Sequence, residues 1–484
     1  MTHIELLDET MRDGQQSLWG MRMQAGMALP AAPLIARTGF RVVDLTGSSH
    51  FEVLIRHCRE NPWDMLDLLV GAMPNTRIRS GMRANACVTF GVTPDALMDA
   101  WMRQLNQHGC RSFWIYDVLF NIDKMLRLAK VAKEYGSEVA GAIMYTMSPV
   151  HSDEYFADKA AKLADSPDVD TILLYDTAGV LDGERLRTLV PAISKRANGK
   201  PIEFHSNNLL GMSTKSYVEA IELGISILHT ASRPMANGPS VPSTEIMVHN
   251  IELLGHTHGI DKSLLPPVAA HFEKVGKAAG FPVNQFAEYN VLSLQHQIPG
   301  GMMGTLKAQL AQHGMSQRLD EVLRETAQVR RELGYPGMAT PFSQLVGIQS
   351  VLNVVSGERY KIVPDEVIKY AAGHYGQSVA SIDPNVRDKI MSAPNARDII
   401  AHPPEQPTIQ ELRKRYGTQD DDELILRALV PETDLQRMRA AGPIKTKFPL
   451  LSSAELEEAA HLIEAARSPL VQYAAHGLSL ELRR

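Results

Sequence analysis

The sequence is poor in cysteine: its 484 residues include three, Cys58, Cys87 and Cys110, and no two of them form a CxxC pair. Their number and spacing exclude a disulfide framework and a cysteine-based zinc site, and they favour a reducing compartment. A basic surplus is also lacking, because 49 lysines and arginines face 55 acidic residues and leave a net charge of −6. This balance argues against a nucleic-acid-binding protein.

Long hydrophobic runs are missing as well. No uninterrupted apolar stretch approaches the roughly 20 residues that a membrane span needs, and the amino terminus lacks the charged and apolar regions of a secretory signal. We therefore expect a cytoplasmic protein without a membrane partner. The composition, 44% hydrophobic and 21% charged, is typical of a globular chain with a sizeable core.

The first half of the chain does contain short β-prone segments that alternate with helical ones. The segments are Ile4–Asp13, Arg41–Gly47, Arg77–Ala84, Ser112–Val118, Glu138–Thr146, Thr171–Gly179, Pro201–Asn208 and Ile225–Ser232. Eight strands with a plausible helix in each gap, spread over about 250 residues, predict an α/β protein built on a TIM (β/α)8 barrel. A doubly wound sheet is the alternative, but the GxGxxG turn of a dinucleotide-binding first strand is absent.

Polar side chains stand at the carboxyl end of every predicted strand. They include Arg12, Asp13, Gln16, Asp44, Arg83, Tyr116, Tyr175, His205, Asn207 and His229. Barrel enzymes place their chemistry at this end of the strands. Eight polar ends in register therefore predict an active site at the barrel mouth.

The second half of the chain is mostly helical. Helices are predicted at Leu264–Ala279, Gly304–Gln312, Leu319–Leu333, Phe342–Ser356, Pro364–Tyr375, Ile409–Tyr416, Asp421–Val430 and Ala454–Ala475. The proline-rich segment His402–Pro407 predicts a linker. We therefore expect a barrel over residues 1–260, a helical domain over 261–401 and a short helical tail over 402–484.

Five short segments together resemble one known family. They are MRDGQQS at 11–17, YTMSPVH at 145–151, DTAG at 176–179, QIPGGM at 297–302 and ATPFSQLVG at 339–347. In this order they are similar to blocks of the biotin-dependent carboxyltransferase domains of pyruvate carboxylase, oxaloacetate decarboxylase and transcarboxylase, within the DRE-TIM metallolyase superfamily. The chain is identified as a divergent member of this family.

The resemblance implies a barrel that carries a divalent metal beneath a helical funnel, here residues 261–401, which contributes to the site. Carboxybiotin on a separate carrier loses CO2, and the enolate of a keto acid captures it. By position, Arg12, Gln16 and Arg83 match residues that hold the keto acid, and Thr340 matches the threonine that shuttles a proton between substrate and biotin. The planar fork of arginine suits a carboxylate, and a hydroxyl can relay a proton.

Two of the family's four metal ligands are missing. Asp13 and His205 match ligands, but Tyr175 stands in place of a carbamylated lysine and Asn207 in place of a second histidine. Such a set is poor for zinc or manganese, and magnesium would bind weakly. Gln15 also replaces a histidine of the pyruvate enzymes. We expect a degraded metal site, in which Tyr175 and Gln15 donate hydrogen bonds to the enolate or to a different acceptor.

Each candidate also has a structural interpretation that stays open. Arg12 could form a salt bridge with Asp13 or Glu9, and His205 could be a hydrogen-bonded core histidine. Thr340 precedes a proline and could be the N-cap of a helix.

No biotin-attachment motif of the Met-Lys-Met type occurs in the sequence. The expected partners are therefore a biotinylated carrier protein and a biotin carboxylase subunit, and the resemblance implies a homodimer. The predicted activity is carboxyl transfer between carboxybiotin and a small keto-acid-like or other carbonyl or carboxylate acceptor. Two alternatives remain: a biotin-independent lyase or decarboxylase, and a non-catalytic paralogue that scaffolds an active carboxyltransferase.

Overall fold

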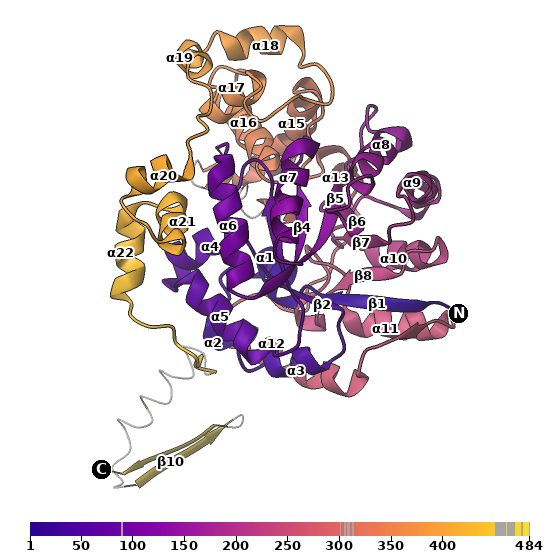
Figure 1. Ribbon diagram of the computed structural model, residues 1–484, viewed down its shortest axis with the longest axis vertical. Coiled ribbons are helices and arrows are strands. Elements are labelled where there is room, and N and C mark those ends of the chain that lie inside the picture. Colours follow the sequence, from indigo (N-terminus) through magenta and orange to yellow (C-terminus); the bar gives the residue numbers. More distant parts are fainter. Residues whose placement is uncertain are drawn as a thin grey trace.

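The computed structural model contains a closed barrel of eight parallel strands (Figure 1). It describes residues 1–450 except 89–90, 301, 304–305, 307–309 and 312–313, and beyond them residue 461 and the segments 470–475 and 478–483. The strands are β1 (His3–Asp8), β2 (Val42–Gly47), β3 (Ile78–Arg83), β4 (Cys110–Tyr116), β5 (Glu138–Met144), β6 (Thr171–Asp176), β7 (Ile202–Ser206) and β8 (Ile227–Thr230). The barrel is closed because β1 pairs with both β8 and β2.

All eight predicted strands are confirmed, but the first one ends five residues earlier than the sequence suggested. The carboxylate of Asp8 accepts hydrogen bonds from the backbone N–H of Thr10 (3.2 Å) and from its hydroxyl (2.7 Å). Such a local bond turns the chain away from the strand direction. Residues Thr10–Gly14 then form a π-helical turn, followed by α1 (Gln15–Leu18).

Helices surround the barrel on its outside (Figure 1). They are α2 (Ala25–Ala28), α3 (Ala32–Arg37), α4 (Ser48–Val53), α5 (Pro62–Ala72), α6 (Asp95–Gln107), α7 (Ile122–Lys133), α8 (Asp153–Ala164), α9 (Gly183–Arg196), α10 (Ser213–Glu222) and α11 (Thr244–Leu253). Helix α7 shows why they pack on the strands: Met125, Leu128, Ala129 and Ala132 are buried at the spacing of one helical face. A two-residue strand, β9 (Thr257–His258), adds to β1.

A second group of helices covers one end of the barrel (Figure 1). Its members are α13 (Val291–His296), α15 (Leu319–Glu332), α16 (Phe342–Ser356), α17 (Asp365–Ala371), α18 (Pro384–Met391) and α19 (Ala396–Ala401), whereas α12 (Leu265–Ala279) lies apart from them beside α3. Arg330 links α15 to the residues that follow β5, because its guanidinium donates to Thr146 Oγ1 (2.8 Å) and to the carbonyl oxygen of Met147 (3.0 Å). Thr146 also donates to Gln297 Oε1 (2.8 Å). The predicted helix Gly304–Gln312 lies mostly outside the described residues.

The chain after residue 402 returns to the barrel wall. Its helices are α20 (Ile409–Tyr416), α21 (Asp421–Leu429) and α22 (Glu432–Ala440). Trp63 Nε1 of α5 donates to the carbonyl oxygen of Asp422 (3.3 Å), and His108 bonds the carboxylate of the same residue (3.0 Å). The predicted helix Ala454–Ala475 falls mainly outside the described residues. Its last part is a strand instead, β10 (Leu470–Ala475), because it pairs antiparallel with β11 (Leu478–Arg483).

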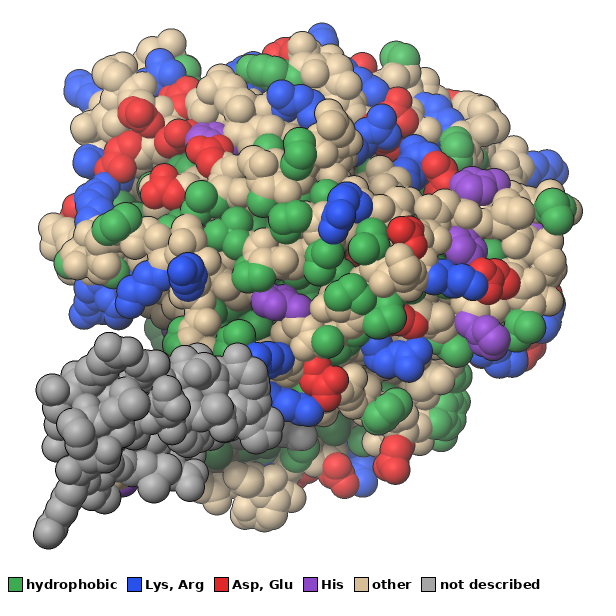
Figure 2. Space-filling view, turned by 90° about the horizontal axis from the view of Figure 1, so that it is seen from below, with side chains coloured by type: hydrophobic (Ala, Val, Ile, Leu, Met, Phe, Trp, Pro, Cys, Tyr) green, Lys and Arg blue, Asp and Glu red, His purple; other side chains and the backbone are tan. Residues whose placement is uncertain are grey.

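The surface carries mixed charge. Acidic and basic side chains are intermingled on the face shown in Figure 2. Within the described ranges, no helix combines the length and the apolar character that a membrane crossing requires.

Candidate active site

A cavity of about 500 Å³ lies between the carboxyl ends of the barrel strands and helix α16. Seven of the nine residues that the sequence predicts for the site line it: Arg12, Asp13, Gln16, Arg83, Tyr175, Asn207 and Thr340. Gln15 and His205 are not part of the lining. The barrel mouth is therefore hollow where the polar strand ends predicted a site, and both the barrel and the helical region contribute to it.

Arg83, the last residue of β3, carries a positive charge that no carboxylate of the described chain pairs. Its Nη2 donates to the hydroxyls of Ser48 (3.3 Å) and Ser49 (3.1 Å) and to the carbonyl oxygen of Cys87 (3.2 Å). Its Nη1 is buried without a hydrogen-bond partner. An unmet buried donor costs about 1–3 kcal/mol, so an anionic ligand at this atom would remove the cost.

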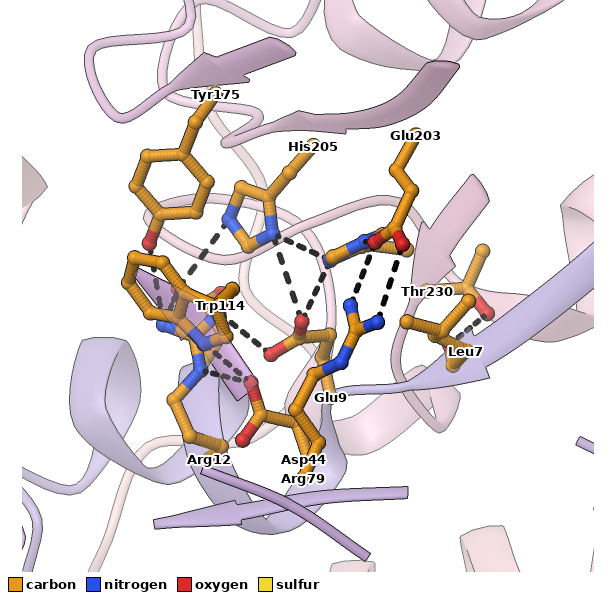
Figure 3. Close-up of polar contacts among 12 residues, drawn as sticks. Leu7, Glu9, Arg12, Asp44, Arg79, Trp114, Tyr175, Glu203, His205 and Thr230 are labelled. Carbon is orange, nitrogen blue, oxygen red and sulfur yellow. Dashed lines mark hydrogen bonds and ion pairs between the residues drawn. The ribbon is translucent and has the colours of Figure 1, made fainter. Parts of the chain in front are cut away.

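Arg12 has a different environment, because its charge is already paired. Nη2 lies 2.6 Å from Glu9 Oε2, Nε lies 3.2 Å from Asp44 Oδ2, and Nη1 donates to the Tyr175 hydroxyl at 3.1 Å (Figure 3). Burial and the charge of Glu9 raise the pKa of Asp44 to about 7. The salt bridge to Glu9 that the sequence left open is present, and Arg12 lines the cavity with its charge already paired.

Gln15 and Gln16 point in different directions because they lie on a helical turn rather than on a strand. Successive residues of a helix are rotated by about 100°. Gln16 lines the cavity, whereas the amide of Gln15 donates to the carbonyl oxygen of Met11 (2.6 Å) and accepts from the N–H of Met23 (3.1 Å). The structure thus gives Gln15 backbone partners in the core instead of a place in the predicted substrate contact.

Stacked aromatic rings form one wall of the cavity. Trp114 lies between Tyr116 and Tyr175, with both ring centroids 4.9 Å away, and its Nε1 donates to Asp44 Oδ2 (2.8 Å). Glycine at position 81 makes room for the indole, because a Cβ there would lie 2.5 Å from the ring. Burial raises the pKa of Tyr175 well above its usual value, so its hydroxyl keeps its proton at neutral pH.

The residues at the family's metal position have hydrogen-bond partners that do not suit a metal. Asn207 Nδ2 faces both oxygens of Asp13 (3.2 and 3.0 Å), and the hydroxyl of Ser240 donates to Asp13 Oδ2 (2.8 Å). A carboxylate can only accept, so Asn207 presents its NH2 group rather than its oxygen to this place. Tyr175 directs its oxygen to Arg12. The donor set of Asp13, His205 and Asn207 does not fit a metal of the family type.

Below the cavity, the barrel interior holds a buried chain of charged groups instead of the usual branched apolar side chains. Glu9, His229, Glu203 and Arg79 follow one another: His229 Nδ1 lies 2.7 Å from Glu9 Oε1 and its Nε2 lies 3.0 Å from Glu203 Oε2. Arg79 donates to both oxygens of Glu203 (2.6 and 3.1 Å). His205 Nδ1 lies 3.2 Å from His229 Nδ1.

The electrostatics of this chain follow from burial and pairing. Burial alone would raise the pKa of Glu9, but the Arg12 guanidinium and hydrogen bonds from His205 and His229 hold it well below its usual range. Burial opposes the proton on His229, yet the hydrogen bonds to Glu203 and Glu9 raise its pKa. Burial lowers the pKa of His205.

Thr340 lies on the funnel side of the cavity and is not a helix cap. The N-cap position of α16 is Pro341 and has no side-chain cap. The Thr340 hydroxyl instead accepts a hydrogen bond from Gln344 Nε2 (2.9 Å), and Ser343 and Gln344 line the cavity with it.

Some residues of the site are not evident from the sequence. Trp114 looks like an ordinary core residue within a β-prone segment, and its only signal is the glycine it faces at position 81. Glu9 and His229 are visible as polar residues near strand ends. Their contact is not, because 220 residues separate them along the chain.

Known proteins resemble the chain in sequence. A family model described as a conserved carboxylase domain matches residues 294–457. A pyruvate carboxylase subunit of Methanocaldococcus jannaschii is 33% identical over 452 residues, which are 92% of this chain and 79% of the relative. The 2-oxoglutarate carboxylase large subunit of Hydrogenobacter thermophilus is 30% identical over 437 residues, 88% of this chain and 67% of the relative.

The fold has solved counterparts as well. The carboxyl transferase domain of Rhizobium etli pyruvate carboxylase, solved with pyruvate and biocytin, superposes with a TM-score of 0.83 at 20% identity and covers 99% of this chain and 84% of that one. The chain spans 45% of a longer pyruvate carboxylase chain from the same organism. At this identity the likeness concerns the fold, and it confirms the TIM barrel followed by a helical region.

Proposed function

The chain belongs to the family of biotin-dependent carboxyltransferases of the pyruvate carboxylase type, and we propose that it moves a carboxyl group between carboxybiotin and a small 2-oxo acid. The observation that carries this proposal is the unpaired Nη1 of Arg83, which shares one cavity with the hydroxyls of Tyr175 and Thr340. Enolate chemistry needs a group that binds the substrate carboxylate, a hydrogen-bond donor to the enolate oxygen and a group that relays a proton. We assign these roles to Arg83, Tyr175 and Thr340 in that order.

Arg83 supplies the contact for the carboxylate of the acceptor. Its Nη2 is fixed by Ser48, Ser49 and Cys87, so the guanidinium is oriented before the substrate arrives. The unmatched Nη1 gains a partner only when an anion binds. A charge-assisted bond of this kind contributes more than a neutral one. Gln16, which also lines the cavity, adds an amide that can donate to the same carboxylate.

Tyr175 stabilises the enolate oxygen. Its oxygen already accepts from Arg12 Nη1 (3.1 Å), which leaves its own O–H proton free to point at the substrate. The paired guanidinium polarises that O–H, and the raised pKa of Tyr175 keeps it a donor. Donors placed where negative charge develops lower the barrier of the chemical step. Because a metal of the family type does not fit here, the Tyr175 hydroxyl donates the hydrogen bond to the enolate oxygen in its place.

Thr340 relays the proton. The bond from Gln344 occupies one lone pair of its oxygen and fixes the rotamer, so its O–H remains available. In the carboxylation direction the hydroxyl gives its proton to the biotin nitrogen that loses CO2 and takes one from the substrate carbon that becomes nucleophilic. The net charge of the threonine is zero before and after the transfer.

The relatives' names point to the partners. Since the Methanocaldococcus jannaschii relative is named as one subunit of its pyruvate carboxylase, we include in the proposal a separate biotinylated carrier protein and a biotin carboxylase subunit. The two relatives are named for different acceptors, pyruvate and 2-oxoglutarate, and the acceptor is therefore left as a 2-oxo acid.

A screen of 2-oxo acids with carboxybiotin, free or on a carrier, tests the proposal. We expect a carboxylated product, identified by mass spectrometry, that depends on biotin and is reduced by Arg83→Met and by Thr340→Ala. Decarboxylation of the product acid at the same rate with and without biotin would support a biotin-independent lyase instead. Unchanged turnover in both variants would place the chemistry elsewhere.

A further inference from the structure

Three buried ligand-type side chains converge inside the barrel, beneath the substrate cavity. Glu9 follows β1, His205 lies on β7 and His229 on β8, and each is fully buried (Figure 3 labels Glu9 and His205). Glu9 Oε1 lies 2.7 Å from His229 Nδ1 and 3.7 Å from His205 Nδ1, and the two nitrogens are 3.2 Å apart. Among the described residues, these three form the group of three or more His, Cys, Asp or Glu side chains whose ligand atoms all lie within 4.8 Å of one another.

The triangle of these atoms has the size of one face of a tetrahedral metal site. Zinc binds imidazole nitrogen and carboxylate oxygen at about 2.0–2.2 Å, which places neighbouring ligand atoms a little over 3 Å apart. A point about 2 Å from all three atoms therefore exists just off their plane. We propose that Glu9, His205 and His229 bind one transition-metal ion of the zinc class, deeper in the barrel than the family's metal position.

The far nitrogen of His229 hydrogen-bonds a carboxylate, as that of a metal-bound histidine usually does, whereas that of His205 has no hydrogen-bond partner. His229 Nε2 lies 3.0 Å from Glu203 Oε2, and His205 Nε2 lies 3.7 Å from Asp13 Oδ1. Glu203 is itself fixed by Arg79 and by the hydroxyl of Thr171 (2.7 Å). In this arrangement the N–H of His229 donates to Glu203, and its Nδ1 lone pair is left to point at the ion.

The buried carboxylates around the cluster outnumber the guanidinium groups beside them. Glu9, Asp13, Asp44 and Glu203 are buried carboxylates, whereas the guanidinium groups among them are two, Arg12 and Arg79. Buried charges are stable when they are paired or coordinate a metal. In the metal-free chain the raised pKa values of His229 and Asp44 offset part of this surplus, and a divalent ion would take the place of the His229 proton.

The ligand set selects the class of ion. Two imidazole nitrogens and one carboxylate oxygen suit zinc and its first-row neighbours, whereas calcium and magnesium prefer oxygen ligands alone. His205 would use Nδ1 here, while its Nε2 faces the cavity side. The Tyr175 ring, which lines the cavity, has its centroid 4.2 Å from that of His205, whereas Glu9, His205 and His229 are not part of the lining. The ion therefore holds Glu9, and through Glu9 it holds Arg12, without contacting the substrate.

Metal analysis of the full chain, purified without a chelator and without a histidine tag, tests the site. We expect about one equivalent of zinc-class metal, lost in Glu9→Gln and His229→Gln and kept in Tyr175→Phe and Asn207→Ala. The last two variants change the family's metal position, so they are the matched controls. Metal that is kept by His229→Gln but lost by Asn207→Ala would overturn the assignment in favour of the family position.

Two measurements keep the inference testable if the ligand variants fail to fold. X-ray absorption of the wild-type chain should show two histidine nitrogens and one oxygen at about 2.0–2.2 Å. Glu203→Gln should weaken Co2+ binding about 10- to 100-fold, because it removes the partner of a ligand. Absence of metal from the purified chain together with no saturable Co2+ binding would overturn the inference and leave His229 as a protonated bridge between two carboxylates. Metal content and Co2+ affinity are measured without turnover, so failure of this inference is distinguishable from failure of the proposed function, which the biotin-dependent assay tests.

Discussion

Replacing Tyr175 by phenylalanine removes a single hydroxyl from the cavity and little else. The ring keeps its stacking against Trp114 and His205. Arg12 loses the bond that it donates to the hydroxyl (3.1 Å) but keeps Glu9 at 2.6 Å and Asp44 at 3.2 Å. The variant should therefore fold, at a cost of about 1.5–3 kcal/mol for one hydrogen bond from a charged donor.

The expected effect on catalysis is larger and confined to turnover. Loss of one donor to a developing oxyanion costs about 2.7–4 kcal/mol, which is about 10²–10³ in kcat. KM should change little, because the proposed function assigns the carboxylate of the bound acceptor to Arg83 rather than to Tyr175. Initial rates of product formation over a range of acceptor concentrations, at saturating carboxybiotin, separate the two constants.

Tyr145→Phe is the matched control. Tyr145 directly follows β5, next to the strand that carries Tyr175, but it does not line the cavity. Its hydroxyl should be dispensable for turnover, and a melting curve of each variant accounts for any loss of folded protein. Equal kcat values for wild type and Tyr175→Phe, or a change in KM alone, would refute the role of Tyr175 as the oxygen-facing donor.

Three further results are expected. Arg83→Met should lower kcat/KM about 10- to 150-fold, mainly through KM, because one charge-assisted contact is worth about 1.5–3 kcal/mol. Substitution of the exposed Arg187 by Met is the control, and an unchanged KM in Arg83→Met would contradict the role of Arg83 in holding the acceptor carboxylate. Thr340→Ala should lower kcat about 10²–10⁴-fold while Thr340→Ser restores most of it; a serine variant as slow as alanine would argue against a hydroxyl relay. Hydrogen bonds to Asp422 and Asp67 raise the pKa of His108 to about 9, so its contribution to stability is complete below about pH 6.5 and is lost as the pH rises through 9. The rate of amide hydrogen exchange of residues 409–440, corrected for the intrinsic rate, should rise between about pH 6 and 10, and the rise should be larger in wild type than in His108→Gln. Equal rises in the two proteins would contradict this role of His108.

The polar interior of the barrel favours function over stability. Arg79, Glu203, His229 and Glu9 occupy the space that branched apolar side chains fill in most barrels. Replacing such a buried network by apolar groups is often neutral or stabilising, whereas removing one partner is costly. The network therefore adds little net stability, and its contacts hold the Arg12 guanidinium next to Glu9 and the Tyr175 hydroxyl.

Much of this architecture is encoded locally and can be read from the sequence. Each β-prone segment and each amphipathic helix depends on residues near it in the chain, so the eight strands and most helices were predictable, as was the polar rim. The resemblance to the family predicted Arg83 and Thr340 as site residues, and both line the cavity.

The tertiary structure alone decided which polar residues meet. Gln15 and Gln16 look equivalent in the sequence, and only the helical turn after Asp8 sends one into the core and the other to the cavity. Closure of the barrel places Glu9 and Asp44 beside Arg12, which also lines the cavity. Glu9 and His229 meet because β1 pairs with β8. Contacts of this kind depend on the path of the whole chain, so no short stretch of sequence contains them.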